Sequence, residues 1–287
     1  MKVAPLVDTV ARDERPAAPV PPATPSRRVP VAEPTAVVPP HLPPAGVTPP
    51  AAATVSSGTP AAAAGQGDDE TPPVYATRLP PSTRLAYRVR RGDLSGTAQL
   101  DWSWSEGRYQ LSLQGLAPAA PQAAWVSRGQ VDIAGVAPER YTQNRRGREI
   151  RAANFQREAG RISFSGPGAE YALVEGSQDR LSWMIQLGAV LSANPDLGQP
   201  DAQIRIFVVG ARGDAETWVF TVQGHEDLDL PGGPVHAAVH LLREPRRPFD
   251  TQAHVWLDPA RHHLPVRLHL RVPATGEGTL LELQSPL

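Results

Sequence analysis

Short runs of alternating apolar and polar residues begin near residue 84 and continue almost to the end of the chain. Leu85, Tyr87 and Val89 alternate with polar or small residues, and a following run places Trp102 and Trp104 on one face. A period of two puts successive side chains on opposite faces of a strand. The pattern therefore predicts β-strands that turn one face toward a core.

About a dozen such runs follow one another, separated by short segments rich in turn residues. Ser105-Glu106-Gly107-Arg108, for example, is typical of a hairpin turn. Short links favour antiparallel neighbours, so we expect a mainly β fold, an antiparallel meander curled into a barrel or half-barrel. The later runs occupy residues 122–133, 149–157, 161–165, 171–174, 204–208, 218–222, 235–242, 253–257, 266–272 and 279–283.

One segment departs from the period of two. Between Ser177 and Ala193 the apolar residues Leu181, Met184 and Ile185 follow a spacing of three and four, which is typical of a helix. This spacing predicts one amphipathic helix at about residues 178–193, capped by Ser177 and packed on the sheet.

The composition changes abruptly near residue 74. No Phe, Trp or Tyr precedes Tyr75, and 17 of the 33 prolines lie in residues 1–73. A segment without large apolar groups cannot bury enough surface to offset its ordering entropy. We expect a disordered Pro/Ala-rich arm at residues 1–73 and one β-rich domain at residues 74–287. The arm acts as a spacer or passive linker, or alternatively as a docking segment for a proline-reading module.

Charge and cysteine content exclude several classes of function. The formal net charge of −1 gives no basic excess for a nucleic-acid backbone. The lack of cysteine excludes disulfides, thiol catalysis and cysteine-ligated metal.

No apolar run is long enough for a transmembrane segment, and the start of the chain does not have the pattern of a signal peptide. Either the protein is cytoplasmic, or its true start lies upstream and an anchor is missing; the oligomeric state stays open.

The common sequence motifs of serine hydrolases and of nucleotide-binding proteins are missing from the sequence. It contains no Gly-x-Ser-x-Gly, no Walker motif and no Gly-x-Gly-x-x-Gly. His236 and His240 are four residues apart on a predicted strand, about 13 Å, which is too far for one metal. We therefore expect a protein that is not an enzyme, with no catalytic, cofactor or metal site. The remote alternative is a hydrolase that uses Asp179 with His240.

Tryptophans and one polar patch supply candidates for ligand binding. Six tryptophans fall on predicted strand or helix faces. The densest polar segment that also contains an aromatic residue is Gln178-Asp179-Arg180-Leu181-Ser182-Trp183. A curved sheet under a helix can hold an amphiphile on its concave face. The alternative is that the tryptophans fill the core and that Asp179 caps the helix. The candidate ligand-binding residues are Trp102, Trp104, Trp125, Asp179, Arg180, Trp183 and Trp218.

Several segments, in order, resemble the DUF3108 family of bacterial proteins, a domain of unknown function. They are Leu85-Ala86-Tyr87-Arg88-Val89, Val136-Ala137-Pro138-Glu139-Arg140-Tyr141, Asp179-Arg180-Leu181-Ser182-Trp183 and Val255-Trp256-Leu257-Asp258. The resemblance covers nearly all of residues 84–284 and implies a periplasmic or cell-envelope location in a Gram-negative bacterium. Family members often have a membrane anchor and a Pro-rich stretch, and this sequence shows only the second. The resemblance brings no activity and no catalytic residues.

These observations favour a non-enzymatic cell-envelope domain that binds a lipid, an amphiphile or a peptide on its curved sheet. The alternative is a structural module that docks an envelope protein and is tethered by the Pro-rich spacer.

Overall fold

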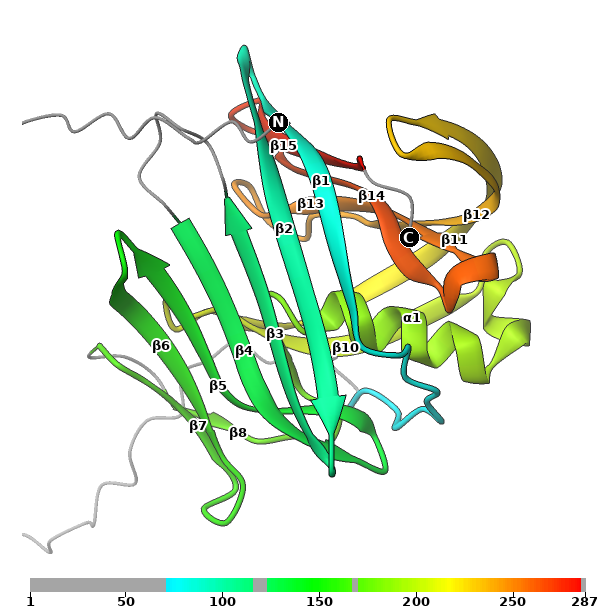
Figure 1. Ribbon diagram of the computed structural model, residues 1–287. Helices are drawn as coiled ribbons and strands as arrows, with labels where there is room; N and C mark the ends of the chain where they lie inside the picture. The colour runs from blue at the N-terminus through cyan, green and yellow to red at the C-terminus, as the bar shows by residue number, and fades with distance from the viewer. Residues whose placement is uncertain (1–70, 116–122, 167–169, 285–287) are drawn as a thin grey trace, which may run out of the picture. The chain divides into compact units, whose positions relative to one another are not determined.

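The computed structural model describes residues 71–115, 123–166 and 170–284. They form one curled, almost wholly antiparallel sheet with a single α-helix against its inner face (Figure 1). This confirms the expected mainly β class. The predicted arm, residues 1–73, lies outside the described residues except for its last three.

The sheet contains fifteen strands among the described residues. They are β1 (Thr83–Arg91), β2 (Leu94–Ser105), β3 (Arg108–Gly115), β4 (Ala123–Asp132), β5 (Gly135–Arg145), β6 (Arg148–Gln156), β7 (Arg161–Phe164), β8 (Tyr171–Ala172), β9 (Gln178–Asp179), β10 (Gln203–Val209), β11 (Ala215–Leu230), β12 (Gly233–Arg243), β13 (Gln252–Asp258), β14 (Leu264–Val272) and β15 (Glu277–Leu283). Two short 3₁₀ turns occupy Pro195–Gly198 and Pro259–Arg261.

The strand order shows two meanders joined at the middle of the sheet. Strands β1 to β8 lie side by side in sequence order, and so do β9 to β15. The first and last strands join the two halves, with Tyr87 opposite Leu283 and Arg88 opposite Glu282. At one edge of the sheet, β9 and β10 pair in parallel.

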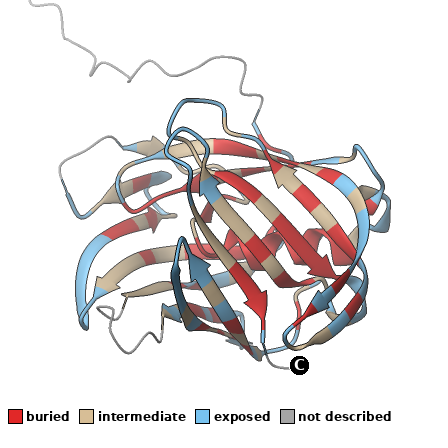
Figure 2. Cartoon of the chain, turned by 90° about the horizontal axis from the view of Figure 1, so that it is seen from above, coloured by how far each residue is buried: buried red, intermediate tan, exposed pale blue. Residues whose placement is uncertain are grey.

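The period of two seen in the sequence is the reason that one face is buried. Buried positions alternate with more exposed ones along the strands (Figure 2). Leu85, Trp102, Trp218 and Phe220 all face a common core with the helix. The inner face of the curled sheet is thus filled by side chains.

The helix α1 (Trp183–Ala193) begins about five residues later than the sequence predicts. Gln178 and Asp179 are drawn into β9 instead, and Ser177 does not cap the helix, because its hydroxyl donates to the carbonyl of Val174. The helix is also buried on every side rather than along one stripe. Among the described residues, no helix is both long and apolar enough to cross a membrane.

Two glutamines attach the helical segment to the sheet. Gln178 donates from Nε2 to the carbonyl of Val136 on β5 at 2.5 Å. Gln186 on α1 accepts from the Val136 amide at 2.9 Å and donates to the carbonyl of Ala134 at 2.6 Å. The edge strand β9 is therefore held against β5 through side chains.

Candidate functional site

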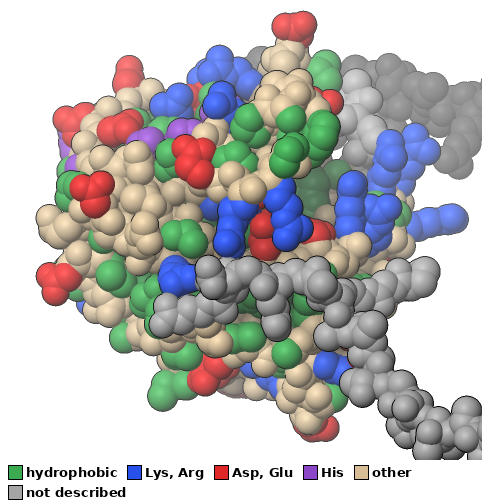
Figure 3. Space-filling view, turned by 180° about the vertical axis from the view of Figure 1, so that it is seen from behind, with side chains coloured by type: hydrophobic (Ala, Val, Ile, Leu, Met, Phe, Trp, Pro, Cys, Tyr) green, Lys and Arg blue, Asp and Glu red, His purple; other side chains and the backbone are tan. Residues whose placement is uncertain are grey.

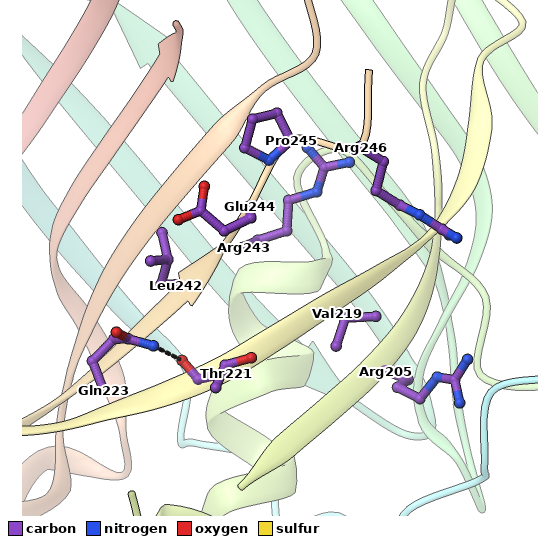
Figure 4. A pocket seen from close by; sticks show the side chains of 9 residues that line it. All are labelled: Arg205, Val219, Thr221, Gln223, Leu242, Arg243, Glu244, Pro245 and Arg246. Carbon is purple, nitrogen blue, oxygen red and sulfur yellow. Dashed lines mark hydrogen bonds between the residues drawn. The ribbon is translucent and has the colours of Figure 1, made fainter. Parts of the chain in front are cut away.

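The outer face of strands β10, β11 and β12 is hollowed into a groove with a volume of about 480 Å³. Val219, Thr221 and Leu242 form its floor, and Thr221 lies opposite Leu242 in the sheet. Arg205 lies beside Val219 in the strand register, at the rim. Figure 4 shows these side chains along the strands, with Gln223 donating to the Thr221 carbonyl at 3.2 Å.

The opposite wall of the groove comes from the end of β12 and the loop that follows it. Glu244, Pro245 and Arg246 line this wall. The Glu244 carboxylate accepts a 2.7 Å hydrogen bond from Gln252 on β13, which fixes its position. The groove thus joins an apolar floor to both guanidinium and carboxylate groups.

A buried arginine anchors the loop that forms this wall. Arg243 is 1% exposed, lies over the Trp218 ring at 4.7 Å, and donates to Asp250 at 2.6 Å and to Glu216 at 3.0 Å. Although burial raises the pKa of Asp250, hydrogen bonds from Arg243 and from the amides of Arg246 and Thr251 outweigh it and lower that pKa below its ordinary value. The wall is therefore held by a charged pair under the groove.

A row of imidazoles adjoins the groove on the same outer face. His254 lies opposite Leu242 in the sheet, and its Nδ1 is 3.1 Å from Nε2 of His240. The other nitrogen of His240 is 2.8 Å from Glu226. Because a carboxylate accepts only, Glu226 holds the proton of neutral His240 on Nδ1 and leaves Nε2 to accept from His254.

Aromatic and cationic groups continue this row across the sheet. The His240 ring stacks on Trp256 with 4.3 Å between centroids and 8° between planes, and Arg267 covers the same indole at 4.9 Å. His254 faces His269 across β13 and β14 at 6.1 Å. Burial lowers the pKa of all three histidines, and in His254 the neighbouring His240 and His269 lower it further. No group of three His, Cys, Asp or Glu side chains in the described ranges is placed to hold a metal ion.

The acidic candidate Asp179 lies in the interior, not in the groove. It is fully buried, accepts from the Ser127 hydroxyl at 2.5 Å, and accepts from the amides of Leu181 and Ser182 at 2.8 Å each. Burial raises the pKa of Asp179 to about 6, although these hydrogen bonds act in the opposite direction. Asp179 and His240, the pair considered for hydrolysis, belong to separate hydrogen-bond sets.

The other predicted ligand-binding residues divide between two places. Trp183 and Trp218 pack together with centroids 5.6 Å apart, and Arg180 lies 4.5 Å over Trp218 and pairs with Asp214. On the other half of the sheet, Trp102, Trp104 and Trp125 lie on β2 and β4. Trp102, Trp183 and Trp218 are at most 2% exposed, whereas Trp104 is 39% exposed and donates to the Pro80 carbonyl. The candidate set is therefore not brought to one cavity, and its role in binding stays a prediction.

The sequence pattern does not predict the groove, because its strongest signal is the apolar stripe that each strand turns toward the core. A usable signal was present where that alternation fails. Val219 lies between Trp218 and Phe220, and Leu242 follows Leu241, so apolar side chains emerge on both faces. Two-faced apolar runs indicate a strand that is covered on both sides.

Comparisons with known proteins identify a family and a set of distant folds. A family model described as "Protein of unknown function (DUF3108)" matches residues 84–281. A comparison with curated proteins found no match. The fold is similar to that of a β-barrel-like protein of domain of unknown function DUF1849 from Brucella abortus, with 14% identity over 73% of this chain and 98% of that chain and a TM-score of 0.43.

The fold is also similar to that of MucB. In the MucB complex with MucA(peri) the identity is 13%, over 71% of this chain and 49% of that one, with a TM-score of 0.31. In the Pseudomonas aeruginosa MucA/MucB complex the identity is 15%, over 71% and 50%, with a TM-score of 0.31. The matched part spans about half of the MucB chains. Likenesses this distant do not assign a function.

Proposed function

Because the chain belongs to the DUF3108 family, whose function is unknown, we propose its function from its own geometry: it is a non-enzymatic cell-envelope module that binds a small amphiphile with an acidic group in the outer groove of β10–β12. The groove itself carries this proposal. Its volume of about 480 Å³ falls within the usual range of small-ligand sites.

The lining suits an amphiphile whose head is acidic. Val219, Thr221 and Leu242 offer apolar contact along the floor, while Arg205 and Arg246 stand at the rim. Guanidinium groups match carboxylate and phosphate in shape and in hydrogen-bond geometry. An acyl or other apolar chain would lie on the floor while its acidic head reaches the arginines.

The position of the groove changes where a ligand is expected. The sequence favours the concave face, but that face is filled by α1 and by core side chains such as Trp102 and Trp218. The outer groove has a wall held in place by Arg243 and Asp250, so binding requires little rearrangement. The envelope location rests on the family resemblance described above.

Native mass spectrometry of the full chain, purified from a bacterial envelope and then extracted under denaturing conditions, tests the proposal. We expect a co-purifying acidic amphiphile in the wild-type protein. Thr221→Trp places an indole in the groove and should abolish its retention. Thr97→Trp makes the same change at an exposed position of β2, away from the groove, and should retain it.

Two results would overturn the proposal. One is a wild-type protein that carries no amphiphile and takes up none when incubated with decanoate or dodecyl phosphate. The other is equal retention in the wild-type protein and Thr221→Trp, which would place the ligand elsewhere.

A further inference from the structure

One rim of the sheet collects the turns between β1 and β2 and between β5 and β6. In an antiparallel meander, alternate strands run in the same direction, so β1, β3 and β5 end where β2, β4 and β6 begin. Four strand spacings separate the two turns along the sheet, on the order of 20 Å. Both turns project from the same rim, the β1–β2 turn further along the strand direction than the β5–β6 turn (Figure 1).

The β5–β6 hairpin carries a cluster of arginines. Arg145, Arg146, Arg148 and Arg151 are all exposed, and no carboxylate in the described residues forms an ion pair with them. The one acidic residue of the turn, Glu149, is held by Arg140 at 2.6 Å. Viewed from behind, basic side chains gather at the side of the molecule where this hairpin lies (Figure 3).

Exposed aliphatic side chains accompany these charges. Ile150 lies within the arginine cluster and is 55% exposed, and Leu94 at the β1–β2 turn is 74% exposed. The boundary of a bilayer accepts both aliphatic side chains and guanidinium groups. The positive charge at the β1–β2 turn is more nearly neutralised, since Arg91 pairs with Glu277 at 3.1 Å.

We propose that this rim docks onto a bilayer that contains anionic phospholipid, with the β5–β6 arginines on lipid phosphates and Ile150 and Leu94 in the interface. Guanidinium groups bind phosphate by paired hydrogen bonds. The whole chain has a net charge of −1, so attraction to an anionic surface requires a local cluster of positive charge such as this one. The proposal stands apart from the groove, which lies on β10–β12.

Co-sedimentation of the full chain with vesicles tests the docking. The vesicles contain phosphatidylcholine alone or an equal mixture with phosphatidylglycerol. We expect binding to the mixed vesicles only, weaker at high salt, and lowered about tenfold or more in Arg145→Gln/Arg146→Gln. The control Arg84→Gln/Arg108→Gln removes the same charge at the opposite rim and should bind like the wild type.

The apolar part of the contact has its own test. Ile150→Ser should weaken binding at low and high salt alike, because insertion of an aliphatic group is not screened. Wild-type protein that ignores phosphatidylglycerol, an equal loss in both arginine pairs, or unchanged binding of Ile150→Ser would overturn the proposal. So would release by inorganic phosphate but not by chloride at equal ionic strength, since that result indicates a site for free phosphate.

Discussion

The Ser127 hydroxyl donates a 2.5 Å hydrogen bond to Asp179 Oδ2 and joins β4 to β9 inside the protein. The Tyr109 hydroxyl lies 2.7 Å from Ser127 Oγ and extends this chain to β3. The second carboxylate oxygen of Asp179 accepts from the amides of Leu181 and Ser182, just before the helix. One buried carboxylate thus orients the start of α1 relative to three strands.

The buried carboxylate should make stability depend on pH. The pKa of Asp179 is about 6 in the folded protein, against 3.8 when exposed, so folding favours its protonated form. This group should add about 3 kcal/mol to the free energy of unfolding below pH 3.8, a contribution lost as pH rises through 6. Asp179→Asn should remove this dependence. Urea unfolding at a series of pH values measures it, with Asp93→Asn as an exposed control; superimposable profiles for Asp179→Asn and wild type would contradict the assignment.

The histidine row should act in the opposite direction. The pKa values of His240 and His254 are lowered in the folded protein. These neutral imidazoles therefore stabilise the fold above the ordinary pKa of 6.5, and their contribution to the free energy of unfolding is lost as pH falls below it. In His240 burial is the main cause, and Glu226 partly opposes it. Glu226→Gln should therefore lower the pKa of His240 further, as read from the imidazole proton shifts by NMR. Glu277→Gln, on β15, should leave it unchanged, and so an equal shift in both variants would rule out the local contact as the cause.

Arg243 should be far more important for stability than an exposed arginine. Arg243→Met leaves Asp250 and Glu216 without their buried partner, and we expect a loss of about 3–5 kcal/mol in the free energy of unfolding. Arg84→Met breaks an ion pair whose arginine is 71% exposed and screened by solvent, and it should have a much smaller effect. Denaturant unfolding compares the two. Similar small losses would show that Arg243 does not hold the loop.

Gly188 on α1 should resist even the smallest substitution. A Cβ there would lie 2.4 Å from the His263 carbonyl oxygen, a backbone atom that cannot easily move. Gly188→Ala should destabilise by about 1–3 kcal/mol, although alanine normally favours a helix. At Gly198 a Cβ meets nothing within 4 Å, which makes Gly198→Ala the control. Thermal unfolding measures the Tm of both variants. A Tm of Gly188→Ala above that of the wild type would contradict the close approach of α1 to the His263 carbonyl.

The strands could be predicted because their alternation reflects one buried face. Leu85, Tyr87 and Trp102 point inward as the period of two requires. The start of the helix could not, because Gln178 and Asp179 have partners on β10, β4 and β5, far away in the sequence. Local spacing carries no information about such partners.

The groove was beyond prediction for a related reason. Its floor combines Val219 with Leu242, and its wall depends on a loop held by Arg243 from beneath. Each of these residues, taken alone, is typical of a side chain on the outward face of a strand or in a loop. Their proximity follows from strand register, which the sequence pattern does not specify across a hairpin as long as β11–β12.

The pairing of β1 with β15 makes the domain's first and last strands immediate neighbours in the middle of the sheet. During synthesis, the half containing β1 to β8 must wait with an open edge on β1 until the final strand leaves the ribosome. The same adjacency means that a short linker could fuse residues 83 and 283 and new ends could be opened at another turn. A circular permutant of that kind should keep every strand pair, whereas removing the last strand would split the sheet into two separate meanders.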